Sequence, residues 1–138
     1  MEQFAEYSHA LSALVLFAVV VLVMSPFSAL AKQGAGLAPG ATPKEDYANK
    51  AYRLNRAYLN GCETLPAFLT VVLAAILAGA SPFWVNLLAS LALLARLVML
   101  FVHLQGVGKP QSGVRTFAYV GGWACMLLLA VLALVAIF

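Results

Sequence analysis

The chain has 138 residues, of which 64% are hydrophobic and only 9% charged, too little polar surface to cover a soluble domain. Its net charge of +3 comes from scattered basic residues without a basic stripe interleaved with aromatics, which argues against nucleic-acid binding. We therefore expect an integral membrane protein with lipid as its main surroundings, folded as a single domain over residues 1–138.

The first apolar run, residues 10–31, has the length of a membrane-spanning helix, and Lys32 ends it. The polar tail before it contains Glu2 and Glu6 but neither Lys nor Arg. Because a secretory signal peptide begins with a basic segment, we interpret this run as a spanning helix.

The second helix is expected over residues 43–78. Thr42-Pro43-Lys44-Glu45 has the pattern of a capping box with proline at the first helical position. The first dozen residues of this helix are polar and should project into water before the apolar part begins.

Two further spans are expected over residues 83–104 and 114–137, separated by a polar loop at 105–113 with several glycines. A tight turn at 79–82 precedes the first of them. The fold class is therefore all-α, an integral membrane four-helix bundle.

The charges of the connecting segments predict the topology. The N-terminal tail, the 79–82 turn and the C-terminus carry no Lys or Arg, so the positive-inside rule puts both termini outside and both long loops in the cytoplasm. The basic residues expected on the cytoplasmic side are Lys32, Lys44, Lys50, Arg53, Arg56, Lys109 and Arg115.

A polar stripe runs along the second helix with a spacing of about 3.5 residues, which is typical of a helix wound against a partner. It consists of Asn49, Arg53, Arg56, Asn60, Glu63, Ala67 and Thr70. We expect this seam to face other helices. The opposite faces, expected to face lipid, carry Leu59, Leu65, Phe68, Leu69, Val72 and Leu73.

Glu63 and Arg96 should lie at matched depth, each about 12 Å below the cytoplasmic edge at about 1.5 Å per helical residue. An unpaired charge at that depth is costly, so we expect the two side chains to meet, within one chain or across a subunit boundary. Such a pair could be purely structural.

Further polar groups lie toward the same half of the bundle, namely Arg56, Asn60, His103, Arg115 and Tyr119. Basic groups exceed acids there, and a surplus of cations in a polar pocket favours an anionic ligand. A small peptide-like acid with two carboxylates would suit this chemistry, and Glu63 could bind its free amine.

The segment Arg56–Phe68, with Arg56, Asn60 and Glu63 followed by Pro66, resembles the signature of the MAPEG family of membrane proteins in eicosanoid and glutathione metabolism. Ala95-Arg96 and Arg115-Thr116, with Tyr119 four residues after Arg115, are similar to further family motifs. Tyr58 stands where the motif has histidine, and Met99 and His103 replace a histidine and a tyrosine common in the family.

This resemblance implies a homotrimer that binds glutathione as co-substrate between neighbouring subunits. Arg115 would stabilise the glutathione thiolate and Thr116 would donate a hydrogen bond to the same sulfur. Arg56, Asn60, Glu63, Arg96, His103 and Tyr119 would bind the rest of the peptide. A glutathione transferase or peroxidase acting on hydrophobic electrophiles from the bilayer is then the expected function.

Two other functions stay open: a non-catalytic scaffold that binds glutathione or a lipid, and a small exporter with Glu63 as proton carrier. Cys62 and Cys125 sit in apolar runs and are expected to be free packing thiols. No second His or Cys stands at ligand spacing from His103, so no metal site is expected.

Overall fold

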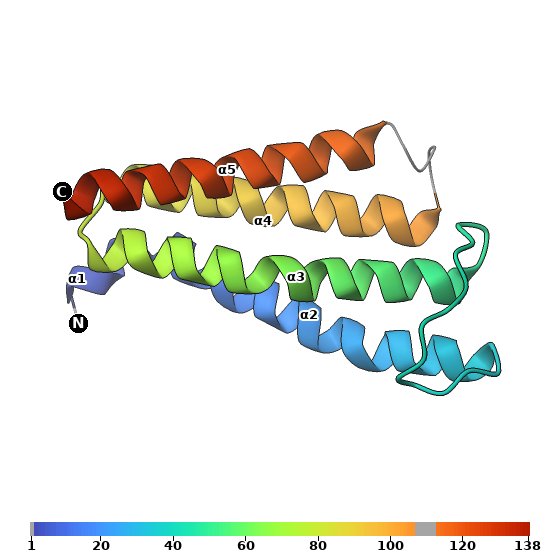
Figure 1. The fold of residues 1–138 in the computed structure, drawn as a ribbon. Coiled ribbons are helices and arrows are strands. Elements are labelled where there is room, and N and C mark those ends of the chain that lie inside the picture. The colour runs from blue at the N-terminus through green and yellow to red at the C-terminus, as the bar shows by residue number, and fades with distance from the viewer. Residues whose placement is uncertain (1, 107–112) are drawn as a thin grey trace.

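The computed structural model describes residues 2–106 and 113–138, and every regular element in these ranges is a helix. Four long helices lie side by side (Figure 1). Each is long and apolar enough to cross a membrane, which confirms the all-α membrane bundle. The helices are α1 (Glu2–Ala5), α2 (Ser8–Gly34), α3 (Lys50–Leu77), α4 (Pro82–Gln105) and α5 (Val114–Ile137).

The start of α3 differs from the expected one, because the helix begins at Lys50 and not at residue 43. Asn49 is the N-cap, and its Oδ1 accepts hydrogen bonds from the amides of Ala51 (2.8 Å) and Tyr52 (3.4 Å). Upstream, Asp46 Oδ1 accepts from the Ala48 amide at 2.9 Å, a local turn that competes with helix formation. The residues from 43 to 49 therefore form a connection, and the expected capping box is wrong.

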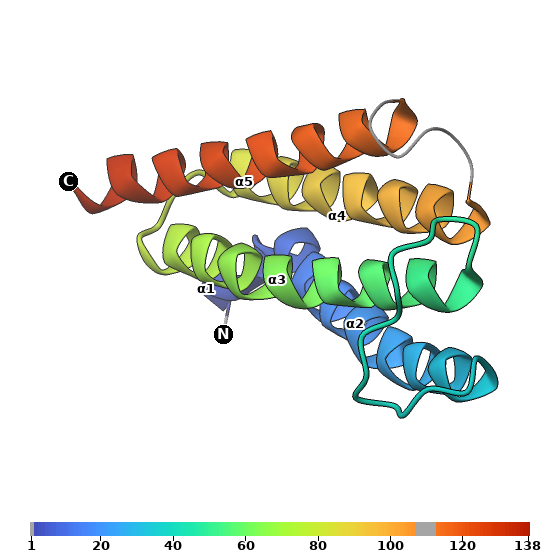
Figure 2. The ribbon, with the colours of Figure 1, turned by 45° about the vertical axis from the view of Figure 1, so that its right-hand side comes forward.

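Both termini lie at one end of the bundle, and the α2–α3 connection lies at the other (Figures 1 and 2). Residues 107–112 of the expected second loop, Lys109 among them, fall outside the described residues. The α2–α3 connection, with the basic residues in and beside it, thus lies at the end opposite the termini, as expected, while the orientation of the bundle in its membrane stays a prediction.

At the end of the bundle where both termini lie, polar contacts join segments that are far apart in the sequence. Asn86 on α4 accepts from the Ala10 amide at 2.9 Å and donates to the Glu6 carbonyl at 2.6 Å, so it caps α2 from another helix. The Tyr7 hydroxyl donates to the Ala80 carbonyl at 2.6 Å. Burial raises the pKa of Tyr7, and the charge of Glu6 raises it further, which keeps this donor protonated.

The core lies between the four long helices in the half of the bundle near the termini. Phe68 and Val72 of α3 are 1% and 0% exposed, and Phe68 packs on Phe17 of α2 at 5.7 Å between ring centroids. Both were expected to face lipid, and both are core residues. Gly61 lets α2 approach closely, because a Cβ there would lie 3.0 Å from Val21.

Large apolar side chains cover the exterior, such as Leu22 (70% exposed) and Phe117 (79% exposed). A soluble protein would hide such side chains, whereas lipid accommodates them. The bundle therefore has a largely apolar exterior, and the candidate site is defined by the polar side chains that gather between its helices at one end.

Candidate functional site

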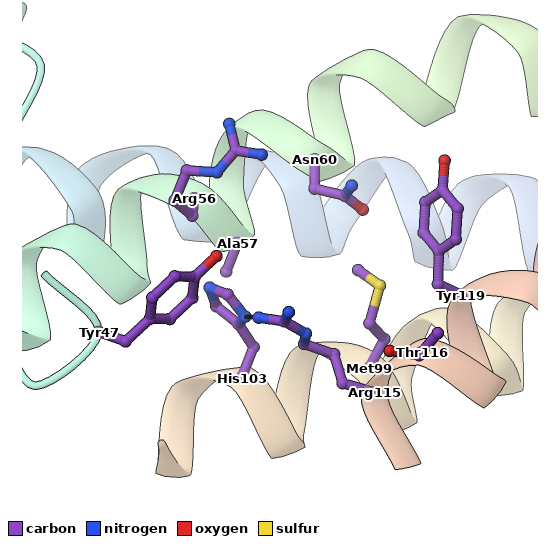
Figure 3. Close-up of a pocket in the computed structure, with 9 residues that line it drawn as sticks. All are labelled: Tyr47, Arg56, Ala57, Asn60, Met99, His103, Arg115, Thr116 and Tyr119. Atoms are coloured by element: carbon purple, nitrogen blue, oxygen red, sulfur yellow. Dashed lines mark hydrogen bonds between the residues drawn. The ribbon is translucent and has the colours of Figure 1, made fainter. Parts of the chain in front are cut away.

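A cavity of about 230 Å³ opens between α3, α4, α5 and the connection before α3 (Figure 3). Six of the eight residues expected at the site line it, from three different helices. The lining residues are Tyr47, Arg56, Ala57, Asn60, Met99, His103, Arg115, Thr116 and Tyr119. The sequence therefore predicted correctly that most of these side chains lie close together in the folded chain.

From α3 the cavity receives Arg56, Ala57 and Asn60, which lie on adjacent turns. The Arg56 guanidinium makes no hydrogen bond or ion pair to the described residues, so it is free to bind a ligand. Ala57 contributes only a methyl group to the lining.

From α4 and α5 come His103 and Arg115, in direct contact. The Arg115 guanidinium lies 3.3 Å from His103 Nδ1. Thr116 and Tyr119 follow Arg115 on the first two turns of α5, and in Figure 3 the Thr116 hydroxyl lies near Arg115 while the Tyr119 hydroxyl points away from it. None of the nine described lining residues is acidic, so nothing in this lining neutralises Arg56 and Arg115.

A third guanidinium lies just behind the cavity wall. Arg96 on α4 is only 5% exposed, donates to Asn60 Oδ1 at 3.0 Å, and has its Cζ 5.1 Å from the centroid of the Tyr119 ring. It also approaches Met99 Sδ at 3.9 Å, and its Nε is buried without a partner. Arg96 does not line the cavity itself, but its buried positive charge contacts three residues that do, Asn60, Met99 and Tyr119.

The expected Glu63–Arg96 contact is absent within the chain. No ion pair joins these two described residues, and Arg96 bonds Asn60 instead. Glu63 follows Asn60 by three residues, so the two side chains diverge by only about 60° around the helix, yet Asn60 contacts Arg96 and the Glu63 side chain is exposed. Glu63 is exposed on the bundle surface and does not line the cavity.

Tyr47 is a lining residue that the sequence analysis missed. It belongs to the connection before α3, where Arg53 donates to the carbonyls of Tyr47 (2.7 Å) and Ala48 (2.9 Å). The Tyr47 ring meets the edge of His103, with centroids 5.8 Å apart. The signal that could have found it is Asn49, because a helix capped there leaves Tyr47 in a connection free to fold back.

A model of the MAPEG family matches residues 9–135, which include every residue of the cavity lining. The chain belongs to the MAPEG family. A search of curated proteins gives no match to it.

In this MAPEG protein the cavity has the chemistry of an anion-binding site. Guanidinium groups bind carboxylates and thiolates through charge-assisted hydrogen bonds, while Asn60, Thr116 and Tyr119 add neutral polar groups. The described residues contain no group of three His, Cys, Asp or Glu side chains placed to hold a metal ion.

Substituting Gly106 by alanine should destabilise this MAPEG protein by about 1–2 kcal/mol from its left-handed φ of 67° alone. A further loss is expected because the new Cβ would lie 3.1 Å from Arg53 Cζ and disturb the residue that holds the Tyr47 connection. Gly79→Ala is the matched control, with φ 73° and no atom within 4 Å of the new Cβ. Thermal unfolding in detergent should show a larger loss for Gly106→Ala; equal losses would contradict the Arg53 contact.

Proposed function

We propose that this MAPEG protein is a membrane-bound glutathione transferase that conjugates hydrophobic electrophiles or reduces lipid hydroperoxides. The observation that carries the proposal is the cavity's charge: two guanidiniums line it, a third stands behind it, and its nine described lining residues include no acid. A tripeptide with two carboxylates and an ionisable thiol would neutralise those cations.

The residues present fit glutathione. Arg56 has no partner among the described residues, and the buried Nε of Arg96 and Nε2 of His103 also lack one. Arg56, Asn60, His103 and Tyr119 would bind the peptide, with Arg96 acting through Asn60. Arg115 and Thr116 would face the sulfur, because a guanidinium stabilises a thiolate and a hydroxyl can donate to it.

Bound glutathione would supply a nucleophilic thiolate, and the protein's part is to keep that sulfur deprotonated beside an apolar surface. The exterior around α5 is apolar, with Phe117 79% and Val120 51% exposed. A hydrophobic electrophile dissolved in the bilayer could therefore reach the cavity laterally, between helices.

We further propose that neighbouring copies complete the site, as a homotrimer. A volume of about 230 Å³ lies below the roughly 300–1,000 Å³ typical of small-molecule pockets, so one chain provides only part of such a site. Glu63 is exposed in the middle of an apolar helix, where a neighbouring subunit would shield it from lipid. The end of the bundle that contains the cavity would lie at the cytoplasmic side of the membrane, and both termini would lie outside.

Titration calorimetry of the detergent-purified protein with glutathione tests this proposal, together with the ultraviolet absorbance of the thiolate. We expect saturable binding and a thiolate signal near neutral pH, and S-methylglutathione should bind without that signal. Binding of glutathione without a thiolate would favour a non-catalytic scaffold. No binding would overturn the proposal.

The exposure of Glu63 also suits a proton-coupled exporter, since a carboxylate at membrane depth can carry protons. Drug transport by reconstituted vesicles that is lost in Glu63→Gln would support that function. We rank it below the transferase and the non-catalytic scaffold because an exporter does not require the cluster of Arg56, Arg96 and Arg115.

Replacing Arg96 by methionine should stabilise the protein and weaken glutathione binding. Arg96 is 5% exposed with no acidic partner among the described residues, so its charge is held at a desolvation cost that an apolar side chain removes. We expect the free energy of unfolding, measured by thermal unfolding in detergent, to rise by about 1–3 kcal/mol, the usual cost of an incompletely compensated buried polar group. Calorimetry should show a clear loss of affinity, and a variant that is both less stable and fully binding would contradict this role.

A further inference from the structure

Arg115 is held by few contacts. It is the second residue of α5, behind the N-cap Gly113, which has no side chain to brace it. Among the described residues its guanidinium contacts His103 Nδ1 at 3.3 Å and the face of Tyr47, with Cζ 5.3 Å from the ring centroid. These two contacts come from different parts of the chain, the end of α4 and the connection before α3 (Figure 3).

The contact between Arg115 and His103 determines which group donates the hydrogen bond and which accepts it. A guanidinium has only donors, so His103 Nδ1 must accept, and the imidazole carries its proton on Nε2. The Tyr47 ring meets the same imidazole nearly edge-on, at an interplanar angle of 80°. Tyr47, His103 and Arg115 thus touch one another pairwise.

Tyr47 is itself held by two residues of α3. Arg53 holds its carbonyl at 2.7 Å, and the ring of Tyr52 packs on it edge-on at 5.1 Å between centroids. Arg53 also packs against Gly106 at the end of α4. The aromatic ring is therefore fixed relative to α3 and α4, and it offers a rigid face to a flexible arginine.

We propose that Tyr47 and His103 are positioning residues that hold the Arg115 guanidinium in the orientation that stabilises the bound thiolate. Without them Arg115 would sample many rotamers and spend less time near the sulfur. This inference rests on the proposed function for its consequence, but the hold on Arg115 is a property of the ligand-free protein.

The hold is tested without any ligand by nuclear magnetic resonance of the Arg115 side-chain Nε–H in detergent. Tyr47→Leu should change the shift and broaden this signal, while Tyr47→Phe, which keeps the ring, should restore it. Tyr58→Leu is the matched control, since Tyr58 lies on α3 outside this cavity lining. An Arg115 signal that does not respond to Tyr47→Leu would overturn the inference, whether or not glutathione binds.

The effect on the thiolate is tested by the pH titration of its absorbance with glutathione bound. Tyr47→Leu should lower the ionisation constant of the bound thiol about two- to fivefold, the range of one cation–π contact at an exposed site. His103→Leu should lower it similarly, and His103→Asn, whose Oδ1 can accept from Arg115, should recover part of the loss.

A double-mutant cycle shows whether Tyr47 acts through Arg115. In an Arg115→Gln background, Tyr47→Leu should have no further effect on the thiol titration. An equal effect in both backgrounds would mean that Tyr47 contacts the ligand directly or only supports the fold, and it would overturn the positioning role. Unfolding temperatures identify any variant that loses the fold. For such a variant the test is whether the conservative substitution, Tyr47→Phe or His103→Asn, brings the Arg115 signal and the thiol titration back toward those of the unaltered protein.

Discussion

Replacing Arg115 by alanine is expected to reduce turnover with glutathione by about 100- to 1,000-fold, the usual loss when a preorganised group that stabilises a developing or bound anion is removed. Arg115 is the lining cation that stands beside a hydroxyl, Thr116, and its guanidinium is already oriented by His103 at 3.3 Å. The measurements are the thiolate absorbance and the initial rate with a hydrophobic electrophile.

The controls for Arg115→Ala separate charge from geometry. Arg115→Lys keeps the charge but not the planar fork, so we expect a partial loss. Lys50→Ala removes an exposed cation at the start of α3, outside the cavity lining, and should leave the rate unchanged. If Arg115→Ala turned over at the rate of the unaltered protein, Arg115 would have no part in activating the thiol.

The spans and the cation cluster could be predicted because both depend on depth in the membrane, which can be inferred from the sequence. Hydropathy marks where the chain enters and leaves an apolar slab, and helical rise converts residue number into depth. Arg56, Asn60, His103, Arg115 and Tyr119 were expected at one level and do line one cavity.

Rotation about each helix axis was harder to infer. Glu63 and Arg96 were matched in depth, but Arg96 bonds Asn60 and Glu63 points off the bundle. Phe68 and Val72 were placed toward lipid and are buried instead. In a membrane the core and the surroundings are both apolar, so hydrophobic periodicity does not separate an inward face from an outward one.

The connection before α3 escaped prediction for a different reason. Thr42-Pro43-Lys44-Glu45 carries a genuine helix-start pattern, but Asp46 and Asn49 both bond backbone amides and move the helix start to Lys50. Two local signals competed, and only the folded chain shows that the later one wins. That outcome brings Tyr47 to the cavity.

Glu63 is the residue whose surroundings one chain leaves incomplete. It lies at the middle of α3, a helix whose span has a mean hydropathy of 1.6, and it is exposed. Its stripe continues through Ala67 and Thr70, which are exposed too, so one polar edge of α3 has no cover from its own bundle. Because lipid solvates a carboxylate poorly, we infer that a polar or cationic group of a neighbouring copy binds it.

Substituting Glu63 by leucine should therefore dissociate the proposed homotrimer. The change strands the neighbour's polar group, at a cost of about 3 kcal/mol or more if that group is a cation, which corresponds to more than about a hundredfold in the association constant. It also makes the separated chain more soluble in lipid. Native mass spectrometry or cross-linking across a range of detergent dilutions should show the shift toward monomer, with Glu63→Gln intermediate and Glu45→Leu, in the connection before α3, unchanged. Oligomers that persist in Glu63→Leu while glutathione binding is lost would instead assign Glu63 to the ligand, because the carboxylate would then serve the bound peptide's amine and not the subunit contact.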